Sequence, residues 1–131
     1  MPKSILRDKS YAFAIAIVKA CQHIQKEQKE FVLSKQVLRS GTAIGALIVE
    51  AEFGQSKPDF IHKLSIALKE ANETKYWLSI MYDTDYLGRE YYDKLDAECK
   101  EIVAMLVASI KTLKAKNQYR LLTFSFSLLT P

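Results

Sequence analysis

Residues 56–81, with the sequence SKPDFIHKLSIALKEANETKYWLSIM, contain the clearest structural signal in this chain. Ser56 followed three residues later by Asp59 is typical of a helix N-terminus, and Pro58 fits the first turn, where its missing N–H breaks no hydrogen bond. A row of residues then repeats at alternating steps of four and three: Phe60, Leu64, Ala67, Ala71, Thr74, Leu78 and Met81. Such a heptad row is typical of helices that pack in bundles. We therefore predict a long helix with one face in a helical core.

The segment 8–28 also has helical spacing, but its apolar surface is wider. One row consists of Phe13, Ile17, Ala20 and Ile24, and a second row of Tyr11, Ile15 and Val18. A helix that buries only one face in its own domain shows a narrower apolar stripe. We therefore predict that the second row, Tyr11, Ile15 and Val18, is an oligomer interface.

Residues 35–52 form a third helical segment, and Ser34 is its expected N-cap. Its centre, Ser40 to Val49, has no charged residue and contains Gly41 and Gly45. A glycine inside a helix costs about 1 kcal/mol relative to alanine. We expect this cost to be offset by a neighbouring helix that packs closely against both glycines.

Residues 88–116 repeat the heptad pattern, with acidic residues at the start and lysines at the end, as the helix dipole favours. In the tail, Leu122, Phe124, Phe126 and Leu128 alternate with Ser and Thr, which is the spacing of a strand. The predicted fold is all-α: an antiparallel up-down-up-down four-helix bundle over residues 1–117, with an extended C-terminal tail over residues 118–131 as a separate arm.

The composition limits the class of protein. A chain of 131 residues with 49% hydrophobic and 26% charged residues is typical of one globular domain. Two cysteines are too few for a disulfide framework, which together with the lack of a secretory signal favours a cytoplasmic location. The longest internal uncharged run has ten residues, fewer than the ~20 that a membrane span needs, so we expect no membrane partner.

Motifs for catalysis are lacking in the sequence. Metal-binding bundles use Glu-x-x-His pairs, and none occurs here. No phosphate-binding loop is present, and Cys21 and Cys99 lie on apolar rows, where cysteine is usually a small buried hydrophobe. We expect no catalytic residue, no metal and no cofactor, and therefore no enzyme. A carboxylate metal-binding bundle enzyme is the remote alternative.

Charge distribution points to a candidate interface. The net charge is +4, and in an up-down bundle the first residues, the second turn and the end of the last helix share one end. That end contains the candidate nucleic-acid-binding residues Lys3, Arg7, Lys9, Lys57, Lys63, Lys111, Lys114, Lys116 and Arg120. Basic surfaces suit phosphate backbones. The alternative is that the lysines only complement the helix dipole, which leaves a protein-interaction scaffold without nucleic-acid binding.

Two blocks of this sequence carry a family resemblance: residues 39–45, RSGTAIG, and residues 64–74, LSIALKEANET, together with Gln36, Glu50, Ser56 and Phe60. They resemble the bacterial 23S rRNA intervening-sequence proteins. This resemblance implies a homo-oligomeric ring, commonly a pentamer. The accessory proteins of diversity-generating retroelements resemble this fold and bind nucleic acid and a reverse transcriptase, which implies RNA or DNA and a nucleic-acid enzyme as candidate partners. The leading hypothesis is thus a non-enzymatic, ring-forming, nucleic-acid-associated accessory or scaffold protein.

Overall fold

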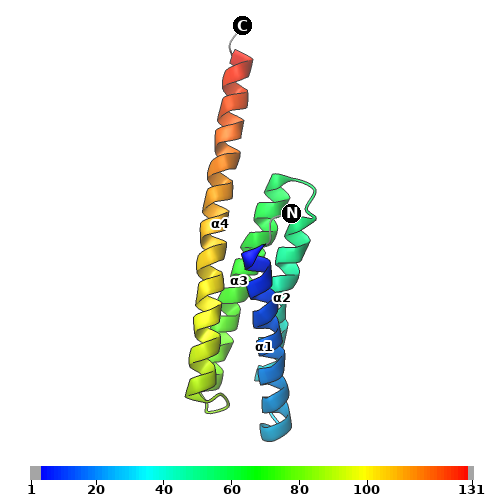
Figure 1. The fold of residues 1–131 in the computed structure, drawn as a ribbon, viewed down its shortest axis with the longest axis vertical. Helices are drawn as coiled ribbons and strands as arrows, with labels where there is room; N and C mark the ends of the chain where they lie inside the picture. Colours follow the sequence, from blue (N-terminus) through cyan, green and yellow to red (C-terminus); the bar gives the residue numbers. More distant parts are fainter. Residues whose placement is uncertain (1–3, 130–131) are drawn as a thin grey trace.

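Four helices make up the chain in a computed structural model, which describes the backbone of residues 4–129 and the side chains of residues 4–118 and 121–123. They are α1 (Ile5–Gln28), α2 (Leu33–Glu52), α3 (Lys57–Asp83) and α4 (Arg89–Leu129). The helices run alternately down and up, so sequential helices are antiparallel neighbours (Figure 1). Helices α1 and α4 close the bundle with the least contact of the four adjacent pairs. The predicted all-α up-down-up-down bundle is confirmed.

The bundle core contains the heptad row of α3. Leu64, Ala67, Ala71, Thr74, Leu78 and Met81 are all buried, as the spacing predicted. The start of α3 also follows its sequence pattern, because the Ser56 hydroxyl accepts a hydrogen bond from the backbone N–H of Asp59 at 3.2 Å. The other helices contribute the buried residues Phe13, Ile17, Ile24, Val37, Ile44, Ile48, Leu95, Ile102 and Leu106.

The N-terminus of α2 is capped by Glu30, so the prediction of Ser34 as the N-cap was wrong. The Glu30 carboxylate accepts hydrogen bonds from the backbone N–H groups of Val32, Leu33 and Ser34 at 2.7–2.8 Å. Ser34 lies buried inside the helix, where its hydroxyl donates to the Glu30 carbonyl. Burial disfavours the charged carboxylate, but these backbone hydrogen bonds outweigh it, and the pKa of Glu30 is lowered. The two oxygens of the Glu30 carboxylate thus satisfy three backbone N–H groups, more than one serine hydroxyl could accept.

The two glycines of α2 lie against α1. A Cβ atom on Gly41 would be 3.0 Å from both Cγ atoms of Ile17, which is fully buried. A Cβ atom on Gly45 would be 3.3 Å from the Ser10 hydroxyl and 3.5 Å from the Ser10 backbone. The small residues therefore let the surface of α1 approach the backbone of α2 along two turns.

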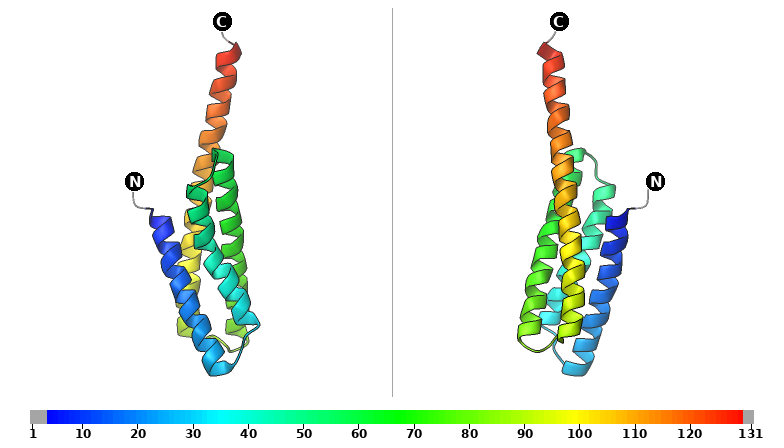
Figure 2. Two further views of the ribbon diagram at one scale, coloured as in Figure 1. Left: turned by 90° about the vertical axis from the view of Figure 1, so that its right-hand side faces the viewer. Right: turned by 60° about the vertical axis from the view of Figure 1, so that its left-hand side comes forward.

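The C-terminal segment is helical, so the predicted extended conformation of residues 118–129 was wrong. Helix α4 passes residue 117 without a break and reaches Leu129, well past the end of the bundle (Figures 1 and 2). It has 41 residues against 27 in α3, a difference of about 20 Å in length. A lone strand would have no neighbour to pair with, whereas a continuing helix satisfies its own backbone groups. Residues 130 and 131 of the predicted arm lie outside the described residues.

Candidate oligomerisation and nucleic-acid surfaces

An apolar surface lies along the outside of α1 and α2. The two helices enclose a groove of about 480 Å³, lined mainly by apolar and small residues that include Tyr11, Ala14, Ala46 and Val49. We call these four residues the α1–α2 face. Tyr11 is 69% exposed, and Phe53, directly after the end of α2, is 80% exposed. Large apolar side chains in this arrangement are typical of a surface that a partner covers.

The three residues predicted as an oligomer interface lie on the outer flank of α1. Tyr11 and Ile15 are exposed, and Val18 is half-buried. Tyr11 lines the groove between α1 and α2, whereas Ile15 lines a second groove of about 320 Å³ between α1 and α4. Sequence reasoning missed Val49 and Ala46, which the fold places beside Tyr11. The signal that could have found them is the uncharged stretch from Ser40 to Val49, which supplies apolar residues on more than one side of α2.

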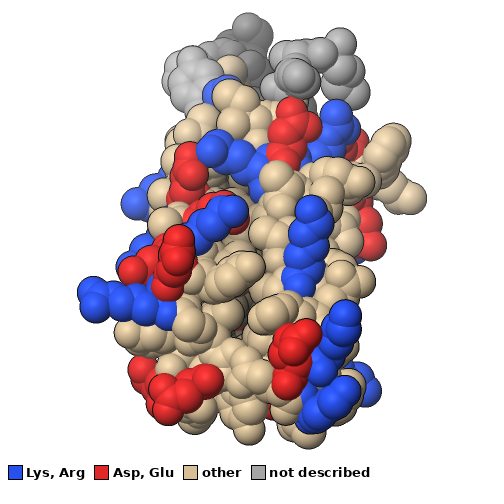
Figure 3. All heavy atoms as spheres, turned by 60° about the horizontal axis from the view of Figure 1, so that its bottom comes forward, with Lys and Arg blue, Asp and Glu red and all other residues tan. Residues whose placement is uncertain are grey.

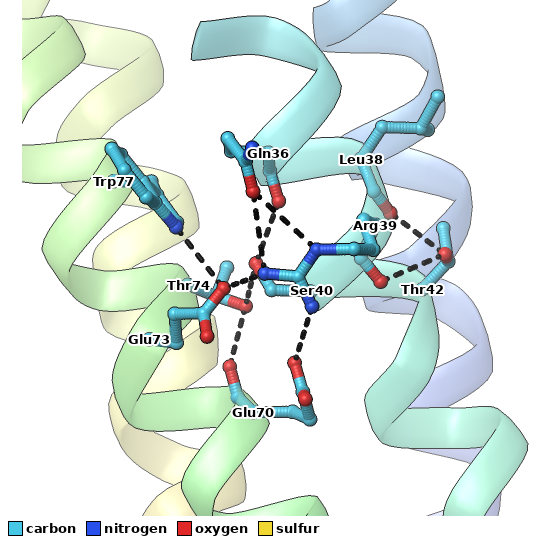
Figure 4. Close-up of polar contacts among 9 residues, drawn as sticks. All are labelled: Gln36, Leu38, Arg39, Ser40, Thr42, Glu70, Glu73, Thr74 and Trp77. Atoms are coloured by element: carbon cyan, nitrogen blue, oxygen red, sulfur yellow. Dashed lines mark hydrogen bonds and ion pairs between the residues drawn. The ribbon is translucent and has the colours of Figure 1, made fainter.

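A polar network joins α2 to α3 on another side of the bundle (Figure 4). The half-exposed Arg39 guanidinium forms ion pairs with Glu70, at 3.3 Å, and with Glu73. The Trp77 indole N–H also donates to Glu73, at 3.1 Å. Asn72, which lies between the two glutamates in the sequence, is exposed. The network fixes α2 against α3 with partly screened charges and leaves neither carboxylate without a partner.

Three of the predicted nucleic-acid-binding residues are engaged by carboxylates of the same chain. Arg7 pairs with Glu52 at 2.9 Å, and Lys9 pairs with Glu101 at 2.6 Å. Lys63 pairs with Glu50 at 3.4 Å. These pairs offset the positive charge locally and reduce what each cation can contribute to an external phosphate.

Four other lysines at the same end are exposed and form no ion pair within the described part of the chain: Lys57, Lys111, Lys114 and Lys116. The three on α4 flank Leu113, which lines a groove together with residues at the start of α1 and the end of α2. Lys3 lies outside the described residues, and so does the side chain of Arg120. The opposite end, brought forward in Figure 3, has acidic and basic side chains interspersed. Among the described residues, the basic surface at this end therefore consists of four unpaired lysines, fewer than the nine residues that the sequence predicted.

Both cysteines are buried and free. Burial raises the pKa of the Cys21 thiol to about 11 and that of Cys99 to about 12. Their sulfur atoms lie within hydrogen-bond distance of the carbonyls of Ser34 and Ala71, respectively. Both thiols are therefore protonated near neutral pH, which is unfavourable for a nucleophile.

Neither a cluster of metal ligands nor a membrane-spanning helix occurs among the residues that the structure describes. No three His, Cys, Asp or Glu side chains among them are grouped so that they could hold a metal ion. No helix within the same residues combines the length and the apolar character needed to cross a bilayer.

Comparison with known proteins identifies relatives of this bundle. Residues 3–108 match the family model described as 23S rRNA-intervening sequence protein. The chain is also similar to the crystal structure of a protein with unknown function from the S23 ribosomal protein family of Bacteroides thetaiotaomicron. The two share 53% sequence identity with a TM-score of 0.81, and the match covers 82% of this chain and 99% of that chain. No curated protein matches the sequence. The part of α4 from residue 109 onward lies beyond the family model.

Proposed function

This chain belongs to the 23S rRNA-intervening sequence protein family, and we propose that it is a non-enzymatic, ring-forming cytoplasmic scaffold that contacts RNA or DNA through its basic end. The observation that carries the proposal is the exposed apolar α1–α2 face. A nucleic-acid enzyme is the further partner that such an accessory protein would serve.

The α1–α2 face supports self-association because it is apolar and exposed in the single chain. Tyr11 and Val49 are exposed on it, and the highly exposed Phe53 comes directly after the end of α2. Burial of apolar surface is favourable by about 25 cal/mol per Å², so covering these side chains in an oligomer would contribute several kcal/mol. When one such face binds a different face of the next copy, a closing rotation gives a ring in which all chains are parallel. The number of copies proposed is five.

A parallel ring would place the basic end of every subunit on one rim. Each subunit would contribute the four unpaired lysines, Lys57, Lys111, Lys114 and Lys116, to that rim. Multiple lysines bind phosphate backbones through charge, with affinity that falls steeply as salt rises. Base-specific contacts are not needed for this kind of binding.

Oligomerisation is tested by light scattering coupled to size exclusion. We expect the native chain to have a mass about five times 15.0 kDa. Tyr11→Asp should shift it toward the single-chain mass, because an unpaired charge in an apolar interface costs several kcal/mol. Phe31→Asp is the matched control, since Phe31 is also an exposed aromatic residue but lies in the turn at the other end of the bundle. A native chain that is monomeric at micromolar concentration would refute the ring.

Nucleic-acid binding is tested by fluorescence anisotropy with generic RNA and DNA at rising salt. Replacing Lys111, Lys114 and Lys116 with Glu should abolish binding at low salt. The control replaces three exposed lysines away from this end, Lys26, Lys35 and Lys69, with Glu. Equal losses in both triple variants would refute a localised rim.

A protein-interaction scaffold without nucleic-acid binding is the second candidate. It is favoured by the ion pairs of Arg7, Lys9 and Lys63, which offset part of the basic charge within the chain. Under this alternative, the native ring binds neither RNA nor DNA even at low salt. The two functions are therefore separated by the anisotropy measurement alone.

A further inference from the structure

The last part of α4 projects beyond the ends of the other three helices. We call residues 118–129 the α4 overhang (Figure 2). Leu121 is 60% exposed and Leu122 is 70% exposed. Because adjacent helical residues point about 100° apart, these two leucines together expose a broad apolar surface.

The last part of the α4 overhang has apolar residues at every second position from Leu122 to Leu128, which spreads them over more than one side of the helix. Residues 121–129, LLTFSFSLL, contain no charged residue. On a helix, a step of two residues turns by about 200°, so the alternation that suggested a strand distributes apolar positions to opposite sides. A coiled coil would require a narrow apolar stripe. Thr123 and Ser127, four residues apart, share one side of the helix, and the apolar positions occupy most of the remaining circumference. This apolar surface is wider than a coiled-coil seam, so a second helix would cover only part of it.

The charges beside the α4 overhang favour an anionic partner. No Asp or Glu follows Glu101 in the chain, whereas four cations do: Lys111, Lys114, Lys116 and Arg120. The three lysines are exposed and form no ion pair with any described residue. If the overhangs of two copies packed in parallel, these like charges would be brought together with no acidic residue nearby to offset them. A self-associating tail is therefore disfavoured by charge.

We propose that the α4 overhang inserts into one leaflet of an anionic lipid bilayer. Nine residues of helix, 121–129, are about 14 Å long, close to half of the ~30 Å hydrocarbon thickness. The lysines just before them then lie at the depth of the phosphate groups, where each adds to the attraction for anionic lipid. The sequence-based expectation of no membrane partner considered only the length needed to span a bilayer, and an insertion of one leaflet does not need that length.

This inference goes beyond the proposed function, because it assigns the apolar tip of α4 a ligand of its own. A parallel ring would present several α4 overhangs to one surface and strengthen binding through multivalency. Nucleic-acid binding depends on the lysines, whereas leaflet insertion also depends on Leu121 and Leu122. Substitutions of the leucines therefore separate the two activities.

The test is flotation of the full chain with vesicles of phosphatidylcholine alone or with 30% phosphatidylserine, a proportion of about one lipid in three chosen to give a strongly anionic surface. We expect binding to the anionic vesicles that weakens with salt, and little binding to the neutral ones. Leu121→Gln combined with Leu122→Gln should weaken binding roughly 30-fold or more, because two buried leucines are lost. The matched control is Phe31→Gln with Val32→Gln, two adjacent exposed apolar residues at the other end, and it should bind like the native chain.

Three outcomes would overturn the proposal. The first is no binding of the native chain to either vesicle. The second is equal binding by the native chain and the leucine variant, which would mean that the lysines alone attract the lipid. The third is a fall in solution mass for the leucine variant without vesicles, which would show that the α4 overhang associates with other copies. Anisotropy with RNA should be unchanged in the leucine variant. Failure of membrane insertion would therefore not refute the proposed nucleic-acid binding, which the anisotropy measurement tests separately.

Discussion

Replacing Gly41 with alanine tests how closely α1 packs on α2. The new methyl group would lie 3.0 Å from Cγ1 and Cγ2 of Ile17, which is fully buried and branched at Cβ. A side chain of this kind has one strongly preferred rotamer in a helix and cannot swing away from the contact. We therefore expect the substitution to destabilise the bundle, although alanine is the better helix former.

The magnitude follows from two opposing effects. Alanine in place of glycine inside a helix stabilises by about 1 kcal/mol. Overpacking of a tight core costs about 1–3 kcal/mol. The expected net change is a loss of about 1 kcal/mol. If Ile17 is first shortened to alanine, the steric conflict disappears, and Gly41→Ala should instead stabilise by about 1 kcal/mol. The coupling between the two sites should thus be about 2 kcal/mol.

The assay is urea denaturation of the native chain, both single variants and the double variant. All four are compared at one protein concentration, because association makes the midpoint depend on concentration. Gly45→Ala is the control, since its nearest new contact is the Ser10 hydroxyl at 3.3 Å, and its effect should be smaller than that of Gly41→Ala. If Gly41→Ala stabilises the native chain as much as it stabilises the Ile17→Ala variant, the close contact between α1 and α2 does not exist.

Three further outcomes are expected. Arg39→Gln should lower the free energy of unfolding by about 1 kcal/mol in urea denaturation, because its two ion pairs are only partly buried. Glu30→Gln should cost about 1–2 kcal/mol near neutral pH. Because the pKa of Glu30 is below its ordinary 4.5, this contribution is present above that pH and lost as pH falls through the lower folded value, so thermal unfolding of the two proteins should converge in acid. Cys21 and Cys99 should resist thiol reagents in the native protein and react on unfolding, since burial raises their pKa values to about 11 and about 12.

The core helices could be predicted because their signals are local. The heptad row of α3 and the Ser56 cap depend only on residues a few positions apart, and the structure confirms both. The cap of α2 was predicted wrongly for an equally local reason. Ser34 and Glu30 both precede the apolar run, and only the backbone path after Lys29, which has a left-handed φ of 55°, brings the carboxylate to the open N–H groups.

The end of α4 shows a limit of periodicity. Alternating apolar residues indicate a strand only if a neighbouring strand exists, and residues 4–129 contain none. In its absence, a helix that has already formed continues, because each added residue gains one hydrogen bond. Here the tertiary context decided against the local pattern.

The candidate surfaces depend on contacts between distant residues. Sequence and topology could place the basic residues at one end, but the pairing of Lys9 with Glu101 joins α1 to α4 and requires the finished fold. The groove that Tyr11 and Val49 both line likewise forms only between helices α1 and α2. Such pairings are set by how far each helix is rotated about its axis, which a spacing pattern fixes only roughly.

A buried hydroxyl pair sets the alignment of α2 and α3. Thr74 donates to the Ser40 hydroxyl at 2.9 Å, and Ser40 donates to the carbonyl of Gln36 in its own helix. If α3 slid along α2 by one turn, about 5.4 Å, the hydrogen bond between the two hydroxyls would be lost, at a cost of about 1 kcal/mol, while each hydroxyl would keep the carbonyl of its own helix. Insertions in the connection around Gly54 would then lengthen the loop without changing which side chains meet. Homologous chains can therefore differ in the length of this turn before Ser56 while they keep the same helix register.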